Sequence, residues 1–312
     1  MFAAGAAVRH LSIPVISCNQ TQTAGSERRK QVKQRQDLII PELDQYFYIQ
    51  EEVINVLNSM ERLSKNHPVN ILMTGRQGCG KSSLIRQYAA YFKRPFAVFQ
   101  IGQLSEPGQL FGEHGLKDGD TFYQEFLFPK AITTPGCVIH LEEINRPEHP
   151  KALNELFSVL SEDRSIWVDQ LGMVKVADGV VFFASMNEGE EFTGTDALDV
   201  ALRDRFYIIP VDYLPEDIER KVLVSKTGIS EKNATMILKI LGNLRSDPQI
   251  DTTISVRHSL MIAEIMASGA TLREAIVYSL AISRDIIESL LLSIHVETRD
   301  IDIKSNEYKR FI

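Results

Sequence analysis

The segment Gly75–Ser82 constrains this chain more than any other part of its sequence. It reads Gly-Arg-Gln-Gly-Cys-Gly-Lys-Ser, which matches the pattern G-x-x-x-x-G-K-[ST]. An apolar run, Val69–Met73, leads into it, and residues 83–88 can continue as a helix. Such a loop directs backbone N–H groups at a phosphate near the positive end of a helix, and glycine leaves room for the close approach. The segment therefore predicts a strand, a phosphate-binding loop and a helix, in that order.

The chemistry of this loop predicts ATP and Mg²⁺ as its ligands. We expect Lys81 to reach the β and γ phosphates and the Ser82 hydroxyl to ligate Mg²⁺. A glycine-rich turn that binds nothing is the alternative, and the complete order of strand, loop, lysine, serine and helix weighs against it. The predicted nucleotide-binding residues in this segment are Gly75, Arg76, Gln77, Gly78, Cys79, Gly80, Lys81, Ser82 and Ser83.

Short apolar runs alternate with amphipathic helical patterns from about Pro41 onward. Because buried parallel strands are apolar along their whole length, this alternation predicts an α/β fold, an αβα sandwich with a parallel five-stranded sheet. A helix is expected over residues 151–161, followed by a hairpin that joins residues 165–168 to 173–176. The expected strands of the main sheet are Val69–Thr74, Pro95–Ile101, Cys137–Leu141, Val180–Met186 and Tyr207–Val211.

Helical signals replace the strand signals after Tyr213. Pro215 suits a first helical position, and Gly228 suits a C-terminal stop. Ser230 can cap one further helix, and Thr271 with Glu274 three residues later can form a capping box for another. The sequence therefore predicts a small all-α domain behind the α/β domain.

Four segments follow from these patterns. Residues 1–41 are expected to form a flexible basic arm, 42–213 the nucleotide-binding domain, 214–296 the helical domain and 297–312 a C-terminal tail. The first 40 residues carry a net charge of +4, so the rest of the chain carries −11 of the total −7. An acidic body argues against broad nucleic-acid binding.

Composition also argues against a membrane-spanning protein and against a disulfide-stabilised one. No apolar run reaches the roughly 18 residues that span a bilayer, which predicts that the chain does not insert into membranes. Three cysteines, Cys18, Cys79 and Cys137, are too few for a disulfide framework. These observations favour a reducing, cytoplasmic compartment.

Two consecutive carboxylates, Glu142 and Glu143, end the third expected strand. The carboxyl ends of parallel strands meet at one edge of the sheet, so both side chains are expected in the same crevice as the loop. One carboxylate could then organise Mg²⁺ and the other could polarise water for attack on the γ phosphate. A solvated acidic strand end is the alternative. Asn187 ends the next strand and is either a hydrogen-bonding group beside that water or the start of a turn.

These segments resemble MoxR-type AAA+ ATPases in order and spacing. The resemblance covers roughly residues 42–290 and rests on the loop together with Leu141–Arg146, Phe183–Asn187, Ala201–Phe206 and Ser255–Arg257. Within that group the chain is most similar to the branch of the Q-type rubisco activases, the nitric oxide reductase activating ATPases and the smaller ATPase subunit of aerobic cobaltochelatase.

The resemblance implies roles for individual residues. Arg205 resembles the arginine finger that enters the nucleotide site of a neighbouring subunit, with Arg203 as the less favoured holder of that role. Asn187 matches the first sensor, and Arg257 resembles the second sensor, which couples the nucleotide to the helical lid. Glu143 is the expected catalytic carboxylate, and Ser82 with Glu142 the expected Mg²⁺ ligands. The resemblance also implies a hexameric ring that works with a partner bearing a von Willebrand A-type domain.

Two insertions face the central pore in relatives, and residues 112–128 and 167–176 resemble them. Aromatic side chains there either grip a client protein or simply pack in the core. The aromatic residues in question are Phe111, Phe122, Tyr123, Phe126 and Phe128.

One residue departs from the family pattern, which has Asp where this chain has Glu142. Because Mg²⁺ demands near-ideal octahedral geometry, the longer side chain could slow turnover without abolishing binding. The sequence thus indicates an oligomeric ATPase that remodels or activates a protein partner. A nucleotide-gated scaffold with little hydrolysis and a nucleic-acid motor, which would need a basic channel, are the two alternatives.

Overall fold

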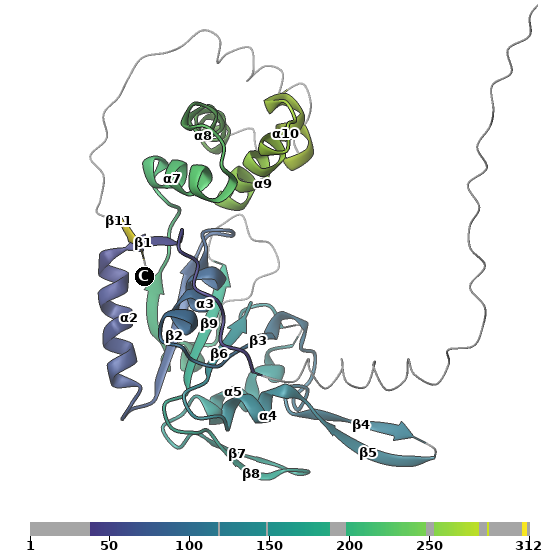
Figure 1. The fold of residues 1–312 in the computed structure, drawn as a ribbon. Coiled ribbons are helices and arrows are strands. Elements are labelled where there is room, and N and C mark those ends of the chain that lie inside the picture. Colours follow the sequence, from purple (N-terminus) through teal and green to yellow (C-terminus); the bar gives the residue numbers. More distant parts are fainter. Residues whose placement is uncertain are drawn as a thin grey trace, which may run out of the picture. The chain divides into compact units, whose positions relative to one another are not determined.

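A five-stranded parallel sheet organises the computed structural model, which describes residues 38–117, 119–147, 149–187, 198–247, 253–280, 286 and 308–310 (Figure 1). The strands lie in the order β10, β2, β9, β6, β3. Every neighbouring pair in this sheet is parallel. The strands are β2 (Val69–Gly75), β3 (Phe96–Gln100), β6 (Val138–Glu142), β9 (Val181–Asn187) and β10 (Tyr207–Pro210), each within about a residue of its predicted bounds.

Helices cover both faces of this sheet, as the apolar strands predict. Ile71 of β2 packs in one cluster with side chains of α2 (Glu51–Leu63) and α3 (Lys81–Tyr91). The next residue, Leu72, packs on the opposite face with side chains of α4 (Leu127–Ile132) and α5 (Asn154–Val159). This alternation confirms the αβα arrangement.

The predicted helix over residues 151–161 is shorter than expected. A 3₁₀ turn, η2 (Pro150–Leu153), precedes α5, and the chain leaves the helix at Leu160. Leu153, Leu156 and Leu160 are nevertheless all buried, as one apolar face of a helix in this segment would be. Two further short helices connect strands: η1 (Ile101–Gln103) follows β3, and α6 (Val200–Arg203) precedes β10.

Two antiparallel hairpins extend from the core outside the main sheet (Figure 1). They are formed by β4 (Gly112–Lys117) with β5 (Asp120–Glu125), and by β7 (Ser165–Val168) with β8 (Gly172–Lys175). The interpretation of Phe111 and Phe128 as client contacts is wrong, because both side chains are fully buried and their rings pack 5.3 Å apart. Phe122, on β5, is 42% exposed and remains available to a partner.

Within the described residues, the helices that follow the sheet are α7 (Glu216–Thr227), α8 (Glu231–Ser246), α9 (Val256–Ala267) and α10 (Leu272–Ser279). Their inward faces form a separate apolar cluster. Ser230 caps α8, and Thr271 with Glu274 forms the predicted capping box of α10. Pro215 lies immediately before α7 rather than in its first turn. None of the helices in the described ranges is long and apolar enough to cross a bilayer.

The C-terminal part contains one strand that the sequence did not indicate. β11 (Tyr308–Arg310) pairs antiparallel with β1 (Tyr48–Gln50), and Arg310 Nε donates to the Tyr48 hydroxyl at 3.1 Å. The predicted arm over residues 1–41 and the ends of the predicted helical domain and tail lie largely outside the described residues. The four segment boundaries remain predictions.

Candidate nucleotide-binding site

The loop between β2 and α3 has the backbone conformation that its glycines predict. Gly75, Gly78 and Gly80 have φ angles of 144°, 72° and 100°. A Cβ on Gly75 would lie 2.0 Å from the Val211 carbonyl oxygen, and one on Gly78 would lie 2.4 Å from the Ser255 side chain. Left-handed backbone and close neighbours together exclude other residue types at Gly75 and Gly78.

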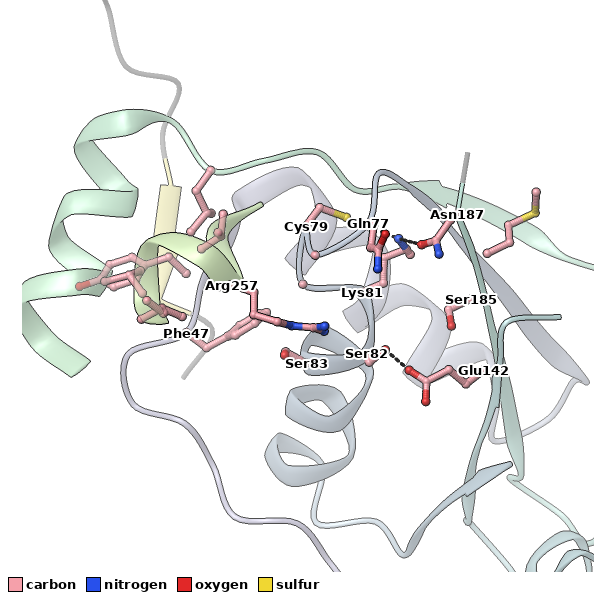
Figure 2. A pocket seen from close by; sticks show the side chains of 18 of the residues that line it. Phe47, Gln77, Cys79, Lys81, Ser82, Ser83, Glu142, Ser185, Asn187 and Arg257 are labelled. Carbon is pink, nitrogen blue, oxygen red and sulfur yellow. Dashed lines mark hydrogen bonds between the residues drawn. The ribbon is translucent and has the colours of Figure 1, made fainter. Parts of the chain in front are cut away.

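A cavity of about 480 Å³ opens beside this loop. It extends from the carboxyl ends of the central strands to the helices that follow the sheet, and Figure 2 shows its principal side chains. Gly75 and Arg76 belong to the loop but are not among the described residues that line the cavity. The predicted residues that line it are Gln77, Gly78, Cys79, Gly80, Lys81, Ser82, Ser83, Glu142, Glu143, Asn187 and Arg257.

Lys81 is buried at the start of α3 and holds the loop together. Its Nζ donates to the carbonyl oxygens of Gly75 at 2.9 Å and Arg76 at 2.8 Å. It also donates to Asn187 Oδ1 at 2.9 Å (Figure 2), although Asn187 is 106 residues away in sequence. Because β2 and β9 pair in parallel register with Gly75 opposite Asn187, the sheet brings the two predicted residues together.

Ser82 and Glu142 are also brought together. Ser82 Oγ donates to Glu142 Oε1 at 2.6 Å (Figure 2), and Gln100 Nε2 donates to Glu142 Oε2 at 2.5 Å. Partial burial opposes ionisation of Glu142, but the hydrogen bonds from Ser82 and Gln100 and favourable charge interactions with His140 and Arg257 hold the pKa of its carboxyl below the ordinary value. Gln100 was missed by sequence reasoning, and only its position at the end of an apolar strand could have indicated it.

This pair fits Mg²⁺. An ionised carboxylate and a hydroxyl lie side by side at the mouth of the loop, and Mg²⁺ in phosphate-binding sites typically takes one or two protein oxygens together with substrate phosphates and water. The described residues contain no cluster of three or more His, Cys, Asp or Glu side chains that could hold a metal by themselves. A metal here would therefore depend on the nucleotide for further ligands.

Glu143 follows β6 in an unusual backbone conformation. Its φ is 56°, a left-handed value that costs a residue other than glycine about 1–3 kcal/mol. The side chain forms an ion pair with Arg146 at 3.3 Å. A Cβ on Gly102 would lie 3.2 Å from Glu143 Oε2, so the glycine leaves room for this carboxylate. Arg146 and the space left by Gly102 thus hold Glu143 at the cavity in a backbone conformation that glutamate rarely adopts.

Arg257 reaches the cavity from the second residue of α9, and its side chain points toward the loop and the start of α3 (Figure 2). Ser255 caps this helix, and its backbone N–H donates to His258 Nδ1 at 3.0 Å. Burial and the positive charges of Arg257 and Arg245 keep the pKa of His258 below its ordinary value. A neutral imidazole can accept this hydrogen bond, whereas a protonated one cannot.

The two candidate finger residues lie away from the cavity of their own chain. Arg205 stacks over the Phe157 ring at 5.1 Å and donates to the Ala201 carbonyl oxygen. Its buried Nε has no hydrogen-bond partner among the described residues. Arg203 is exposed at the end of α6. Neither residue lines the cavity, so their roles as arginine fingers remain predictions.

Comparison with known proteins places this arrangement in a family. Residues 70–206 match the model of the AAA domain, dynein-related subfamily. The chain is 57% identical over 272 residues to the "putative chaperone BssE" of Thauera aromatica, with 87% of this chain and 95% of the relative covered. The chain belongs to the dynein-related AAA family. This result confirms the resemblance to MoxR-type AAA+ ATPases.

Other relatives of this AAA+ protein are more distant. An uncharacterised protein of Staphylococcus haemolyticus is 29% identical over 194 residues, covering 60% of this chain and 71% of the relative. A RuvB mutant from Thermotoga maritima has a TM-score of 0.50 at 17% identity, covering 80% of this chain and 72% of the other. The second likeness concerns the fold alone, and it agrees with a P-loop AAA+ core followed by helices. Family and fold together support nucleotide binding and a chaperone-like ATPase in general terms.

Proposed function

We propose that this protein is an oligomeric, Mg²⁺-dependent ATPase that remodels or activates a partner protein. The observation that carries the proposal is that four predicted residues meet in two hydrogen-bonded pairs, Lys81 with Asn187 and Ser82 with Glu142, at one cavity beside the loop. A structural glycine turn would not require four polar side chains from three elements to meet there.

The residues that line the cavity have separate proposed roles. Backbone N–H groups of the loop and Lys81 bind the phosphates, and the apolar side chains of Phe47, Val222 and Leu260 offer a surface for the adenine ring. Ser82 and Glu142 would hold Mg²⁺, which neutralises charge on the phosphate oxygens when bound. Glu143 orients and polarises the attacking water.

The remaining groups would sense the phosphate. Asn187 is the last residue of β9 and accepts a hydrogen bond from Lys81, a position from which its amide could hydrogen-bond the water or the γ phosphate. Arg257 would link the same phosphate to the helices that carry it. Both assignments rest on position in the cavity and on the family pattern.

Arg205 would complete the site of a neighbouring subunit. Its place outside the cavity of its own chain supports this role, because an arginine that serves a neighbouring subunit should not line its own nucleotide site. Arginine fingers contribute about 10³- to 10⁵-fold in rate by stabilising charge in the transition state. A ring, hexameric as in relatives, would place each Arg205 against the next nucleotide.

The client is proposed to be a protein. The relative that is 57% identical is described as a "putative chaperone", which supports a chaperone-like role in general. The finer proposal, enzyme activation or metal and cofactor insertion in the cytoplasm with a partner that bears a von Willebrand A-type domain, rests on the resemblance to MoxR-type ATPases. A nucleotide-gated scaffold with little hydrolysis is the second candidate, favoured by Glu142 in place of Asp. A nucleic-acid motor has less support, because the chain beyond residue 40 is acidic.

Two variants test the site. Lys81→Ala should abolish ATP binding, whereas Glu143→Gln should keep binding and lose hydrolysis, because only Glu143 acts on water. Binding is measured by calorimetry and hydrolysis by phosphate release, with Glu113→Gln on the exposed hairpin as the matched control. Native turnover by the Glu143→Gln protein would overturn the catalytic assignment.

Mixed rings test the role of Arg205. Lys81→Ala and Arg205→Ala proteins should each be inactive, and mixing them should restore part of the activity because some interfaces then combine an intact loop with an intact finger. Native mass spectrometry verifies co-assembly. A mixture as inactive as its components would refute catalysis across subunits.

A further inference from the structure

The linker between β10 and α7 touches the phosphate-binding loop through one side chain. Tyr213 Oη donates a hydrogen bond to the Gln77 carbonyl oxygen at 2.9 Å, across 136 residues of sequence. We propose that Tyr213 is a positioning residue: it sets the orientation of the Gln77–Gly78 peptide in the loop and ties that orientation to the helices after the sheet. The proposal rests on the proposed ATPase function.

The orientation of this peptide matters for phosphate binding. In a planar trans peptide the carbonyl and the N–H point in opposite directions. With the Gln77 carbonyl held toward Tyr213, the Gly78 N–H must point away from the linker, and both residues line the cavity. A peptide turned the other way would present a carbonyl dipole where the loop needs a donor for an anion.

The opposite end of the same peptide is also held. Gly78 has a φ of 72°, and a Cβ at this position would lie 2.4 Å from the side chain of Ser255, which caps α9. The peptide therefore lies between the linker on one side and the start of the helix that carries Arg257 on the other. Movement of that helix must change the packing on Gly78.

Tyr213 itself packs against an ionic network that extends into the core of the helical part. The Arg245 guanidinium lies 5.6 Å from the centre of the Tyr213 ring. Arg245 forms two hydrogen bonds of 2.9 Å with Glu219, a fully buried carboxylate that also accepts from Ser259 Oγ at 2.6 Å. Arg245 Nε further donates to the carbonyl oxygen of Ile254, just before the cap of α9.

This network connects three helices to the loop. Glu219 lies on α7, Arg245 on α8 and Ser259 on α9, so the guanidinium beneath Tyr213 is positioned by the core of the helical part. A shift of these helices moves Arg245, and Tyr213 transmits it to the Gln77 carbonyl. The loop is thereby coupled to the helices through a contact separate from that of Arg257.

The test removes the hydroxyl and keeps the ring. Tyr213→Phe should weaken ATP binding about three- to tenfold, the size of one neutral hydrogen bond, while Tyr278→Phe, at a 78% exposed position on α10, should not. Displacement of a fluorescent ATP analogue by ATP measures the affinity of both variants. The same assay with AMP as competitor shows whether the loss of affinity depends on the β and γ phosphates. AMP should lose less than twofold, since the loop is built for the outer phosphates.

Hydrogen exchange adds a readout without nucleotide. Peptides that cover Gln77 to Lys81 should exchange faster in Tyr213→Phe than in wild type or Tyr278→Phe, with the melting temperature unchanged. Equal ATP affinity and equal exchange in the two variants would overturn the inference and leave the ATPase proposal standing. Equal losses for AMP and ATP would also overturn it, because a general disturbance of the cavity would then explain the effect. A wild-type protein that binds no ATP would overturn both proposals.

Discussion

Replacement of Glu142 by Asp tests whether the longer side chain weakens Mg²⁺ binding or whether the site is adapted to it. The change removes one methylene, which withdraws the carboxylate by roughly one carbon–carbon bond, about 1.5 Å. Contacts of 2.6 Å to Ser82 and 2.5 Å to Gln100 would lengthen to roughly 4 Å, beyond hydrogen-bonding range. The structure therefore predicts that Asp at this position loses both of its donors.

The size of the effect follows from these two bonds. A hydrogen bond to a charged group contributes about 1.5–3 kcal/mol, and because both donors are exposed we take about 1 kcal/mol for each. The loss of about 2 kcal/mol corresponds to roughly a 30-fold higher Mg²⁺ concentration for half-maximal ATP binding. This expectation runs against the sequence pattern, in which Asp is the normal residue.

The assay is a magnesium titration of ATP binding, with electron paramagnetic resonance of Mn²⁺ as a direct measure of metal affinity. In a Gln100→Ala background the same Glu142→Asp change should cost only about fivefold, because one of the two bonds is already absent. Glu113→Asp, the same chemical change on an exposed strand, is the control. An unchanged or lower magnesium requirement in Glu142→Asp would refute the reasoning.

Three further outcomes are expected. Asn187→Ala should lower kcat about tenfold or more and leave ATP affinity within about threefold, measured by steady-state kinetics, and a loss confined to affinity would contradict its placement. Because the pKa of partly buried His258 is lowered in the folded protein, the unfolded chain takes up a proton at a higher pH than the folded chain. The free energy of unfolding should therefore fall as pH drops below about 6.5, and His258→Gln should flatten this fall in urea titrations while exposed His67→Gln should not. Phe128→Ala should cost about 3–5 kcal/mol of stability and Phe122→Ala less than about 1 kcal/mol, and equal costs would contradict their assigned burial.

The nucleotide-binding loop could be predicted because its requirements are local. Left-handed backbone at Gly78 and Gly80 is available to glycine and almost to no other residue, so the residue types report the conformation directly. The strands could be predicted for a similar reason. Burial on both faces demands an apolar side chain at nearly every position, and β2 and β9 show that pattern along their length.

The pairing of side chains could not be predicted from these patterns. Gln100 meets Glu142 because β3 lies next to β6 in parallel register, and strand order is a property of the whole sheet. The room that Gly102 leaves for the Glu143 carboxylate likewise depends on how η1 approaches the end of β6.

The aromatic residues of the first hairpin also show what the sequence could predict and what it could not. Phe111 and Phe128 lie at its base and are fully buried against each other, whereas Phe122 lies in β5 and is partly exposed. The spacing of these three phenylalanines in the sequence is that of an apolar cluster, whether a side chain is buried or exposed. The sequence by itself determined the α/β fold and the phosphate-binding loop, because backbone conformation and burial select residue types one position at a time. Only the tertiary structure decided which side chains meet, because contacts between distant residues depend on the packing of every element that separates them.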